Sequence, residues 1–278
     1  MSEVAANREF EYSRQDFERV RSLIRARAGI SLAPGKEDMV YGRLARRLRQ
    51  HGLSSFREYL DMLEHSDGTE WQAFTNALTT NLTAFFREPH HFDALRELFA
   101  RLSPHRPLRV WSAAASTGEE PYSLAMTAVE HFGSFTPPVT ILATDIDTNV
   151  LDTGSRGVYP LERLDKLSLE RRRRFFLRGT GQNEGYCRVV EGLRRMIEFK
   201  PINLLDSQWH LREPFDAIFC RNVMIYFDKA TQYSILSRMV PLLARDGLFF
   251  AGHSESFFHA TDLLQSCGRT IYRRVQAN

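Results

Sequence analysis

The first 80 or so residues carry apolar side chains at the three- and four-residue spacing of amphipathic helices. Phe17, Val20 and Ile24 repeat in this way, and a glycine at Gly29 marks a stop before the same spacing resumes. Successive apolar stripes of this kind pack helices against one another. The pattern predicts a small all-helical domain over residues 1–85.

After a proline-containing stretch at residues 103–107, the periodicity changes. Short β-prone runs now alternate with helical patterns, which is typical of a mostly parallel sheet covered by helices on both faces. We therefore expect an α/β domain over residues 86–278. Glycines and short β-prone runs interrupt the alternation at about 171–200, which we interpret as a small antiparallel insertion with a binding role. The expected strands include 108–111, 139–143, 215–219 and 247–251.

The composition fits a globular protein of two domains. The 278 residues are 43% hydrophobic and 26% charged, enough to bury a core without disulfides or metals. The cysteines, Cys187, Cys220 and Cys267, are far apart, which argues against a disulfide framework or a zinc site. The N-terminus lacks the apolar core of a secretory signal, and no run of about 18 apolar residues follows. These features predict a cytoplasmic protein.

A strongly basic segment stands out, although the formal net charge is only +3. Between residues 41 and 57 the chain carries five arginines and no acidic residue. Four of them, Arg43, Arg46, Arg47 and Arg49, belong to one expected helix. Such a segment attracts an acidic partner, and the alternative is a solubilising face opposite the apolar one.

Small residues fill the loop after the first expected strand. Residues 112–118 are Ser-Ala-Ala-Ala-Ser-Thr-Gly, and a helix is expected to begin near Glu119. Such a loop lets a ligand approach the backbone closely, as in the nucleotide-binding loops of doubly wound sheets. The alternative is helix capping alone, since Ser116 or Thr117 can form a capping box with Glu119 or Glu120.

Acidic residues near this loop indicate which nucleoside is bound. Asp145 ends the second expected strand, where a carboxylate can accept both hydroxyl groups of a ribose, whereas Asp147 is better placed to cap the next helix. Glu119 and Glu120 would repel a pyrophosphate but attract the amino group of a methionine-like tail. This favours S-adenosylmethionine over NAD. Asn203, after a later β-prone run, is placed to border an adenine.

Two further segments are unusual: residues 79–88, Thr-Thr-Asn-Leu-Thr-Ala-Phe-Phe-Arg-Glu, and residues 251–256, Ala-Gly-His-Ser-Glu-Ser. Together with the loops described above, they resemble the chemotaxis receptor methyltransferase family, CheR, and the resemblance runs from about Phe17 to Ile271. It implies a Rossmann-like S-adenosylmethionine methyltransferase sheet with a small all-helical N-terminal domain and a small antiparallel β-insertion. It also implies that glutamate side chains of chemoreceptors are esterified. The cofactor residues that it implies are Asn81, Thr83, Arg87, one of Glu119 or Glu120, Asp145, Asn203, Leu204, Arg221 and Asn222.

The resemblance also implies two contacts with a receptor. The β-insertion would bind a receptor's flexible C-terminal peptide, by adding a strand to a sheet edge. The basic helix carrying Arg43, Arg46, Arg47 and Arg49 would meet the acidic methylation helices of the receptor. Esterification neutralises a glutamate there, which changes the electrostatic state of the receptor and serves adaptation. We expect the chain to act as a monomer.

Methyl transfer to a carboxylate needs alignment and no general base, because the nucleophile is already ionised at neutral pH. Alignment in a site without water can contribute about 7–11 kcal/mol in favourable cases. Arg87 is the first catalytic candidate, since a guanidinium can hold a carboxylate of the substrate or of the cofactor with two parallel bonds. Tyr226 is the second, with a hydroxyl near the transfer centre.

Two other functions compete with this interpretation. A nucleic-acid methyltransferase would use the arginine helix to bind phosphates, but base-amine methyltransferases often carry a polar-Pro-Pro-aromatic loop where this chain reads Arg-Asn-Val-Met at 221–224. A non-catalytic adaptor would sense S-adenosylmethionine and recruit partners. We expect no nucleic-acid partner. His90 and His91 are adjacent and should point in different directions on a helix, so we also expect no metal site.

Overall fold

The computed structural model describes residues 8–102, 106–211 and 214–276. Its contacts divide the chain into two compact units, and the division falls between Thr80 and Asn81. The division expected from the sequence followed Phe85. Among the described residues, the structure contains no helix with both the length and the apolar character needed to cross a bilayer.

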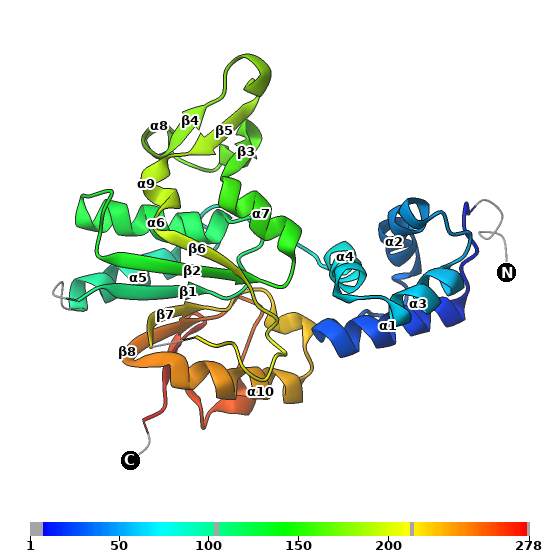
Figure 1. The fold of residues 1–278 in the computed structure, drawn as a ribbon. Helices are drawn as coiled ribbons and strands as arrows, with labels where there is room; N and C mark the ends of the chain where they lie inside the picture. The colour runs from blue at the N-terminus through cyan, green and yellow to red at the C-terminus, as the bar shows by residue number, and fades with distance from the viewer. Residues whose placement is uncertain (1–7, 103–105, 212–213, 277–278) are drawn as a thin grey trace. The chain divides into compact units, whose positions relative to one another are not determined.

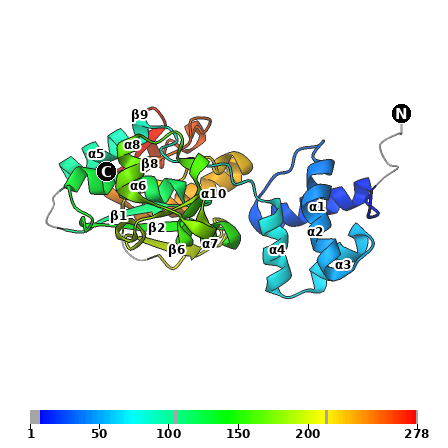
Figure 2. The same cartoon turned by 90° about the horizontal axis from the view of Figure 1, so that it is seen from above.

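The first unit consists of packed helices in its described part (Figures 1 and 2). Ser13 caps the first helix by accepting a backbone hydrogen bond, and Gly29 ends that helix in the left-handed region with φ 70°. Phe17, Val20 and Ile24 are fully buried, as their spacing predicted. The helices of this unit are α1 (Arg14–Ala28), α2 (Glu37–His51), α3 (Phe56–His65) and α4 (Gly68–Leu78).

The second unit is organised around a sheet whose described strands follow the order β6-β2-β1-β7-β8-β10-β9. The first five strands in this order are parallel neighbours, and β10 runs antiparallel to both β8 and β9. The parallel part confirms the expected α/β architecture. The strands are β1 (Leu108–Ser112), β2 (Val139–Asp145), β6 (Ile197–Pro201), β7 (Phe215–Phe219), β8 (Leu243–Phe250), β9 (Leu264–Gly268) and β10 (Ile271–Arg274).

Helices cover both faces of this sheet (Figure 1). Successive strand residues alternate between two apolar cores: Val110 and Phe219 pack on one side, and Trp111 and Ile218 pack on the other. In Figure 1, α6 lies above the strands and α10 lies below them. The α-helices outside the insertion are α5 (His90–Arg101), α6 (Glu119–Phe132), α7 (Thr148–Arg156) and α10 (Lys229–Met239), and the 3-10 helices there are η3 (Met224–Tyr226), η4 (Val240–Leu242) and η5 (Phe258–Ala260).

A small antiparallel sheet projects from this unit, with the order β3-β5-β4 (Figure 1). Its bounds differ from the expected 171–200. The sheet begins before residue 171, and the sequence pattern missed this start because the three-residue β3 is too short to produce a periodic signal. The sheet ends before residue 200, because Ile197–Pro201 pairs with β2 in the large sheet instead. The elements here are β3 (Val158–Pro160), η1 (Leu161–Leu164), α8 (Leu169–Phe175), β4 (Phe176–Arg178), η2 (Gly181–Asn183), β5 (Tyr186–Val189) and α9 (Glu191–Arg194).

Candidate functional site

The carboxyl ends of β1, β2 and β7 meet at the point where the chain reverses its direction across the sheet. After β1 the chain continues to β2 and β6 on one side, and it then returns to β7 on the other side. The loop after β1 is hydrogen-bonded to both neighbouring strands, β7 and β2. The Ala113 N–H donates to the Phe219 carbonyl at 2.8 Å, and the Ala115 N–H donates to the Thr144 carbonyl at 2.9 Å. Open α/β sheets bind ligands in the crevice at such a point.

The small-residue loop is tightly bent. Ser116 and Gly118 have φ values of 49° and 96°, in the left-handed region. A Cβ on residue 118 would lie 2.9 Å from the Gly154 Cα, so glycine is required there. Gly118 is also the N-cap of α6 and makes no side-chain cap, while the Thr117 hydroxyl donates to the Glu119 carboxylate at 2.6 Å. The capping-box interpretation of this segment is therefore wrong.

Asp145 ends β2 beside this loop, and its carboxylate is almost fully buried. It accepts the N–H of Ser116 at 2.8 Å and the N–H of Asp147 at 3.0 Å, and burial raises its pKa to about 6. Asp147 caps α7 by accepting the Asn149 N–H at 2.9 Å, as predicted, and it also accepts the Asn81 side-chain amide at 2.9 Å. An ionised carboxylate can accept about four hydrogen bonds. Asp145 is thus free of the capping role and can accept further donors.

Arg221 forms a buried ion cluster at the end of β7. One guanidinium nitrogen donates to the Glu120 carboxylate at 2.7 Å, and another lies 3.4 Å from the Glu88 carboxylate and donates to the Arg87 carbonyl. Glu120 also accepts the Ser112 hydroxyl at 2.7 Å. Burial raises the pKa of Glu120, against the opposing effect of Arg221. Segments far apart in sequence are thereby joined around one guanidinium.

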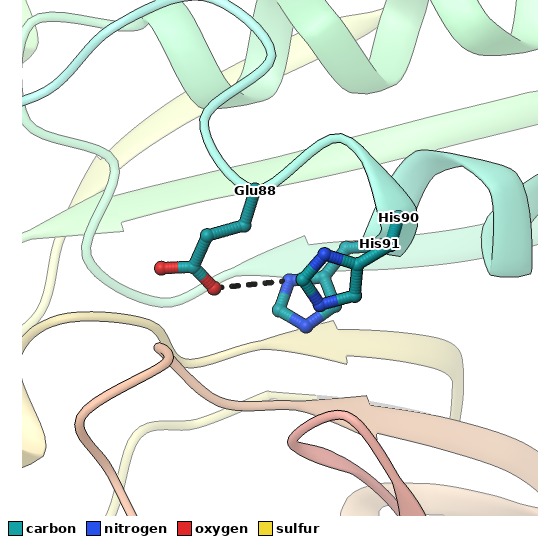
Figure 3. A group of neighbouring side chains, drawn as sticks. All are labelled: Glu88, His90 and His91. Carbon is teal, nitrogen blue, oxygen red and sulfur yellow. Dashed lines mark ion pairs between the residues drawn. The ribbon is translucent and has the colours of Figure 1, made fainter.

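Glu88, His90 and His91 lie close together beside this cluster (Figure 3). The two histidine ring centroids are 4.2 Å apart, so the expectation that these side chains point apart is wrong. Their ligand atoms and a Glu88 oxygen lie within 4.8 Å of one another, an arrangement that can hold a metal. However, Arg221 lies 3.4 Å from the same Glu88 oxygen that approaches His91, and it already supplies a positive charge. We therefore interpret the group as part of an ion network.

The protonation states fit this network. Burial opposes the ionisation of Glu88, but the charge of Arg221 and the hydrogen bonds from His253 outweigh it and hold the pKa of Glu88 at about 2. Burial also lowers the pKa of His91 to about 4. A neutral His91 ring lies 3.2 Å from the Arg269 carbonyl through its Nε2 atom. Hence an ionised Glu88 faces Arg221, and a neutral imidazole packs behind it.

Asn203 and Leu204 follow β6 and lie next to the end of β2. The Ile202 N–H donates to the Asp145 carbonyl at 3.0 Å, which brings this segment beside the buried carboxylate. Asn203 closes a local turn by accepting the Leu205 N–H at 3.0 Å, and the Leu204 side chain is buried. The structure thus brings Asn203 and Asp145 to neighbouring positions at the same edge of the sheet.

The remaining predicted residues lie on two loops. Thr83 and Arg87 are half-buried in the segment before α5, where the Arg87 guanidinium donates to the Leu82 carbonyl at 3.0 Å. Asn222 has a left-handed φ of 58°, and Tyr226 is half-buried at the end of η3. No hydrogen bond or cation–π contact between Tyr226 and Arg87 is present among the described residues. Two buried acids, Glu88 and Glu255, were not predicted, because an isolated acid in a loop has no spacing signal.

Comparisons with known proteins identify the family. The model described as CheR methyltransferase, all-alpha domain, matches residues 15–79, and the model described as CheR methyltransferase, SAM binding domain, matches residues 81–273. The chemotaxis protein methyltransferase 2 of Pseudomonas aeruginosa is 60% identical over 272 residues, which cover 98% of this chain and 97% of that protein. The chemotaxis protein methyltransferase of Salmonella typhimurium is 54% identical, with 92% and 88% covered, and that of Escherichia coli is 53% identical, with 92% and 89% covered. The chain therefore belongs to the CheR methyltransferase family, whose larger domain binds S-adenosylmethionine.

Proposed function

We propose that this methyltransferase esterifies glutamate side chains on the cytoplasmic helices of chemoreceptors and that it works as a monomer in the cytoplasm. The observation that carries the proposal is the carboxyl edge of the sheet, where a buried Asp145 with spare acceptor positions lies near the Arg221 cluster. This edge combines a sugar-binding acid with charges suited to an amino-acid tail. Two relatives that match more than nine tenths of this chain are named as chemotaxis methyltransferases.

The donors and acceptors at this edge fit S-adenosylmethionine. Asp145 accepts the two ribose hydroxyl groups, and the Asn203–Leu204 turn next to it borders the adenine. Asn81 and Thr83, with Arg221 and Asn222 from the opposite loop, surround the rest of the molecule. When bound, the cofactor supplies a methyl group activated by a sulfonium. Charged side chains on the surrounding loops would orient that group.

Of the two adjacent glutamates, we assign Glu120 to the cofactor. Its carboxylate faces the carboxyl edge, where it meets Arg221 and the Ser112 hydroxyl. Glu119 instead accepts the Thr117 hydroxyl and pairs with Arg163 of η1 at 3.2 Å, toward the insertion. The partner of Glu120 is Arg221, in the loop that we assign to the cofactor. Glu120 is therefore the glutamate placed to meet the ammonium group of the cofactor.

Catalysis in this site rests on alignment. The glutamate nucleophile is ionised at neutral pH, so no residue of the chain needs to remove a proton. We assign to Arg87 the orientation of a carboxylate, because only part of its guanidinium is used by the Leu82 carbonyl. Tyr226 contributes its hydroxyl near the transfer centre. Exclusion of water on substrate binding would strengthen each of these charged contacts.

The arginines of the basic helix differ in the partners of their side chains, and this difference refines the docking proposal. Arg49 pairs with Glu9 at 2.5 Å. Arg43 donates to the Leu78 and Thr79 carbonyls at 3.1 and 2.5 Å, and Arg47 pairs with the buried Glu70, so both support the fold of the helical unit. Arg46 is exposed, and no hydrogen bond or ion pair of its side chain is present among the described residues. We therefore assign to Arg46 the main contact with acidic receptor helices.

The insertion supplies the proposed site for a receptor's C-terminal peptide. In the order β3-β5-β4, the strand β4 lies at an edge of the small sheet and its outer backbone groups can pair with an added strand. Leu177 on this strand and Tyr186 on β5 expose 60% and 49% of their surface. Exposed apolar side chains beside an open edge suit a peptide that carries an apolar side chain.

A methylation assay tests the proposed function. Purified protein is incubated with receptor-containing membranes and methyl-labelled S-adenosylmethionine, and the labelled receptor is then treated with alkali. We expect base-labile label released as methanol, because methyl esters hydrolyse in alkali and N-methyl groups do not. Stable label on nucleic acid would favour a nucleic-acid methyltransferase. Binding of S-adenosylhomocysteine without any methyl transfer would favour a non-catalytic adaptor.

A further inference from the structure

Glu255 lies beyond β8, in the segment before η5, and only 4% of its surface is exposed. Its carboxylate accepts backbone N–H groups from two loops. One oxygen accepts Asn222 at 2.9 Å and Gly252 at 2.5 Å, and the other accepts Val223 at 3.0 Å and Met224 at 2.8 Å. One side chain therefore ties the loop after β7 to the loop after β8.

This carboxylate is an unusual group to bury. No ion pair to Glu255 is present among the residues that the structure describes. Burial raises its pKa, and the backbone N–H groups of the two loops oppose that rise. A neutral glutamine offers one acceptor oxygen in place of two, so four donors around one side chain favour the ionised acid. The four backbone hydrogen bonds offset the cost of burying the charge, and they also fix the geometry of these loops.

The loop held in this way is the one that carries predicted site residues. Asn222 adopts a left-handed φ of 58°, and a Cβ on Gly252 would lie 2.2 Å from its side-chain amide. A non-glycine residue keeps such a backbone only where its surroundings enforce it. The same turn begins at Arg221, which binds Glu120, and it leads directly into η3, which ends at Tyr226.

We propose that Glu255 is a positioning residue of the methyltransferase site, whose carboxylate fixes the turn that presents Arg221 and Asn222 to the cofactor. The inference rests on the proposed function, because that function assigns these two residues to the cofactor. Glu255 itself does not touch the reacting atoms. Its loss should therefore weaken cofactor binding beyond what its effect on folding explains.

The test replaces Glu255 with glutamine and measures the Kd of S-adenosylhomocysteine by calorimetry, well below the melting temperature of each variant. We expect the E255Q variant to bind about tenfold or more weakly, because hydrogen bonds to a charged acceptor are lost on both loops. The KM for S-adenosylmethionine should rise in parallel.

Asp216 offers a matched control at the other edge of the same sheet. It is equally buried, at the amino end of β7, and it accepts the Arg109 N–H at 2.9 Å and the Arg106 guanidinium at 2.5 Å. The D216N variant should lose folding stability but bind S-adenosylhomocysteine within about twofold of wild type, since removing a buried partner mainly affects folding.

The outcomes separate the two proposals. Weak binding by E255Q together with normal binding by D216N supports the positioning role, and normal binding by both variants overturns it. If E255Q does not fold, E255D keeps the charge on a shorter side chain and should bind with an intermediate Kd, whereas a wild-type Kd for E255D overturns the role. Wild-type protein that fails to bind S-adenosylhomocysteine would instead overturn the proposed function, before any variant is compared.

Discussion

Each unit of the chain contains a buried cluster of arginine and glutamate, and the two clusters differ in how completely they are satisfied. In the helical unit, Glu70 accepts the Arg47 guanidinium, the Tyr59 hydroxyl at 2.8 Å and a His51 ring nitrogen at 2.8 Å. Burial raises the pKa of Glu70, but these partners together outweigh it and lower the pKa overall. Both oxygens of Glu70 are thus in use.

The cluster around Arg221 in the α/β unit is incomplete by comparison. Among the described residues, Arg221 Nε and His91 Nδ1 are buried without a hydrogen-bond partner, and Glu88 Oε2 has only the longer ion-pair contacts to Arg221 and His91. Left-handed, non-glycine backbone also occurs nearby, at Glu88 and Asn222. Strain and unused polar groups tend to collect where a protein binds a ligand. The comparison therefore separates Arg47, which supports a fold, from Arg221, to which we assign a role in the proposed site.

Replacing Arg47 with methionine should have the largest effect of these changes, and that effect should be confined to stability. Glu70 would be left buried without its guanidinium, which costs about 3 kcal/mol of unfolding free energy. Urea denaturation measures this loss, and calorimetry should show the Kd of S-adenosylhomocysteine unchanged within about twofold, because the ligand site belongs to the other unit. A large loss of affinity with normal stability would reverse the assignment of the two clusters.

Replacing Asp145 with asparagine should weaken S-adenosylhomocysteine binding about 100-fold, since hydrogen bonds to a charged acceptor contribute about 1.5–3 kcal/mol each. The wild-type protein should also bind more tightly as the pH rises through about 6, the raised pKa of this carboxyl. Below that value, each pH unit should cost up to about tenfold in affinity, because ribose hydroxyls donate to the ionised form. Asparagine should abolish this dependence.

The raised pKa of Asp145 affects folding stability in the opposite direction from ligand affinity. Asp145 keeps its proton to a higher pH in the folded protein than its ordinary value of 3.8 would allow. The folded state therefore binds more protons than the unfolded state between about pH 4 and pH 6, and the contribution of Asp145 to stability falls as the pH rises through that window.

For ligand binding, an affinity for S-adenosylhomocysteine that stays flat from pH 5 to pH 7 would contradict the assignment of Asp145 to the ribose.

Charge reversal at Arg46 should have the smallest effect. The R46E variant should lower kcat/KM on receptor membranes about threefold to tenfold, because one exposed charge mainly affects encounter with an acidic surface. The defect should shrink as salt is added. Arg14, exposed on α1, provides a matched control, and R14E should methylate normally. Equal activity of both variants would remove Arg46 from the docking surface.

Much of the fold could be predicted because its elements have a clear period. The helical spacing of Phe17, Val20 and Ile24 placed α1 correctly, and the expected strand at 215–219 coincides with β7. The insertion was misplaced because β3 has only three residues and because β6 follows it without a change of pattern. Strand order was not predictable, since it depends on tertiary packing that no local pattern encodes.

The site could be predicted only in part. The sequence places Asp145 at a strand end and marks the bent loop before α6, because both features are local. The ion network around Arg221 joins segments that are remote in sequence, so its partners Glu88 and Glu120 could not be chosen from spacing. The same limit applies to Glu255, whose role depends entirely on backbone groups of other loops. A resemblance can name such residues, but it does not explain what holds them.

The hydroxyl of Tyr159 has a practical consequence for anyone who wishes to shorten this enzyme. Tyr159 lies in β3, the first strand of the small sheet. Its hydroxyl nevertheless donates at 2.7 Å to the Thr117 carbonyl, and its ring packs edge-on against Phe85. A truncated version without the whole small sheet would leave the Thr117 carbonyl without this donor and would open a gap beneath the bent loop. Trimming must therefore stop short of this tyrosine, and a minimal catalyst has to keep the base of the small sheet.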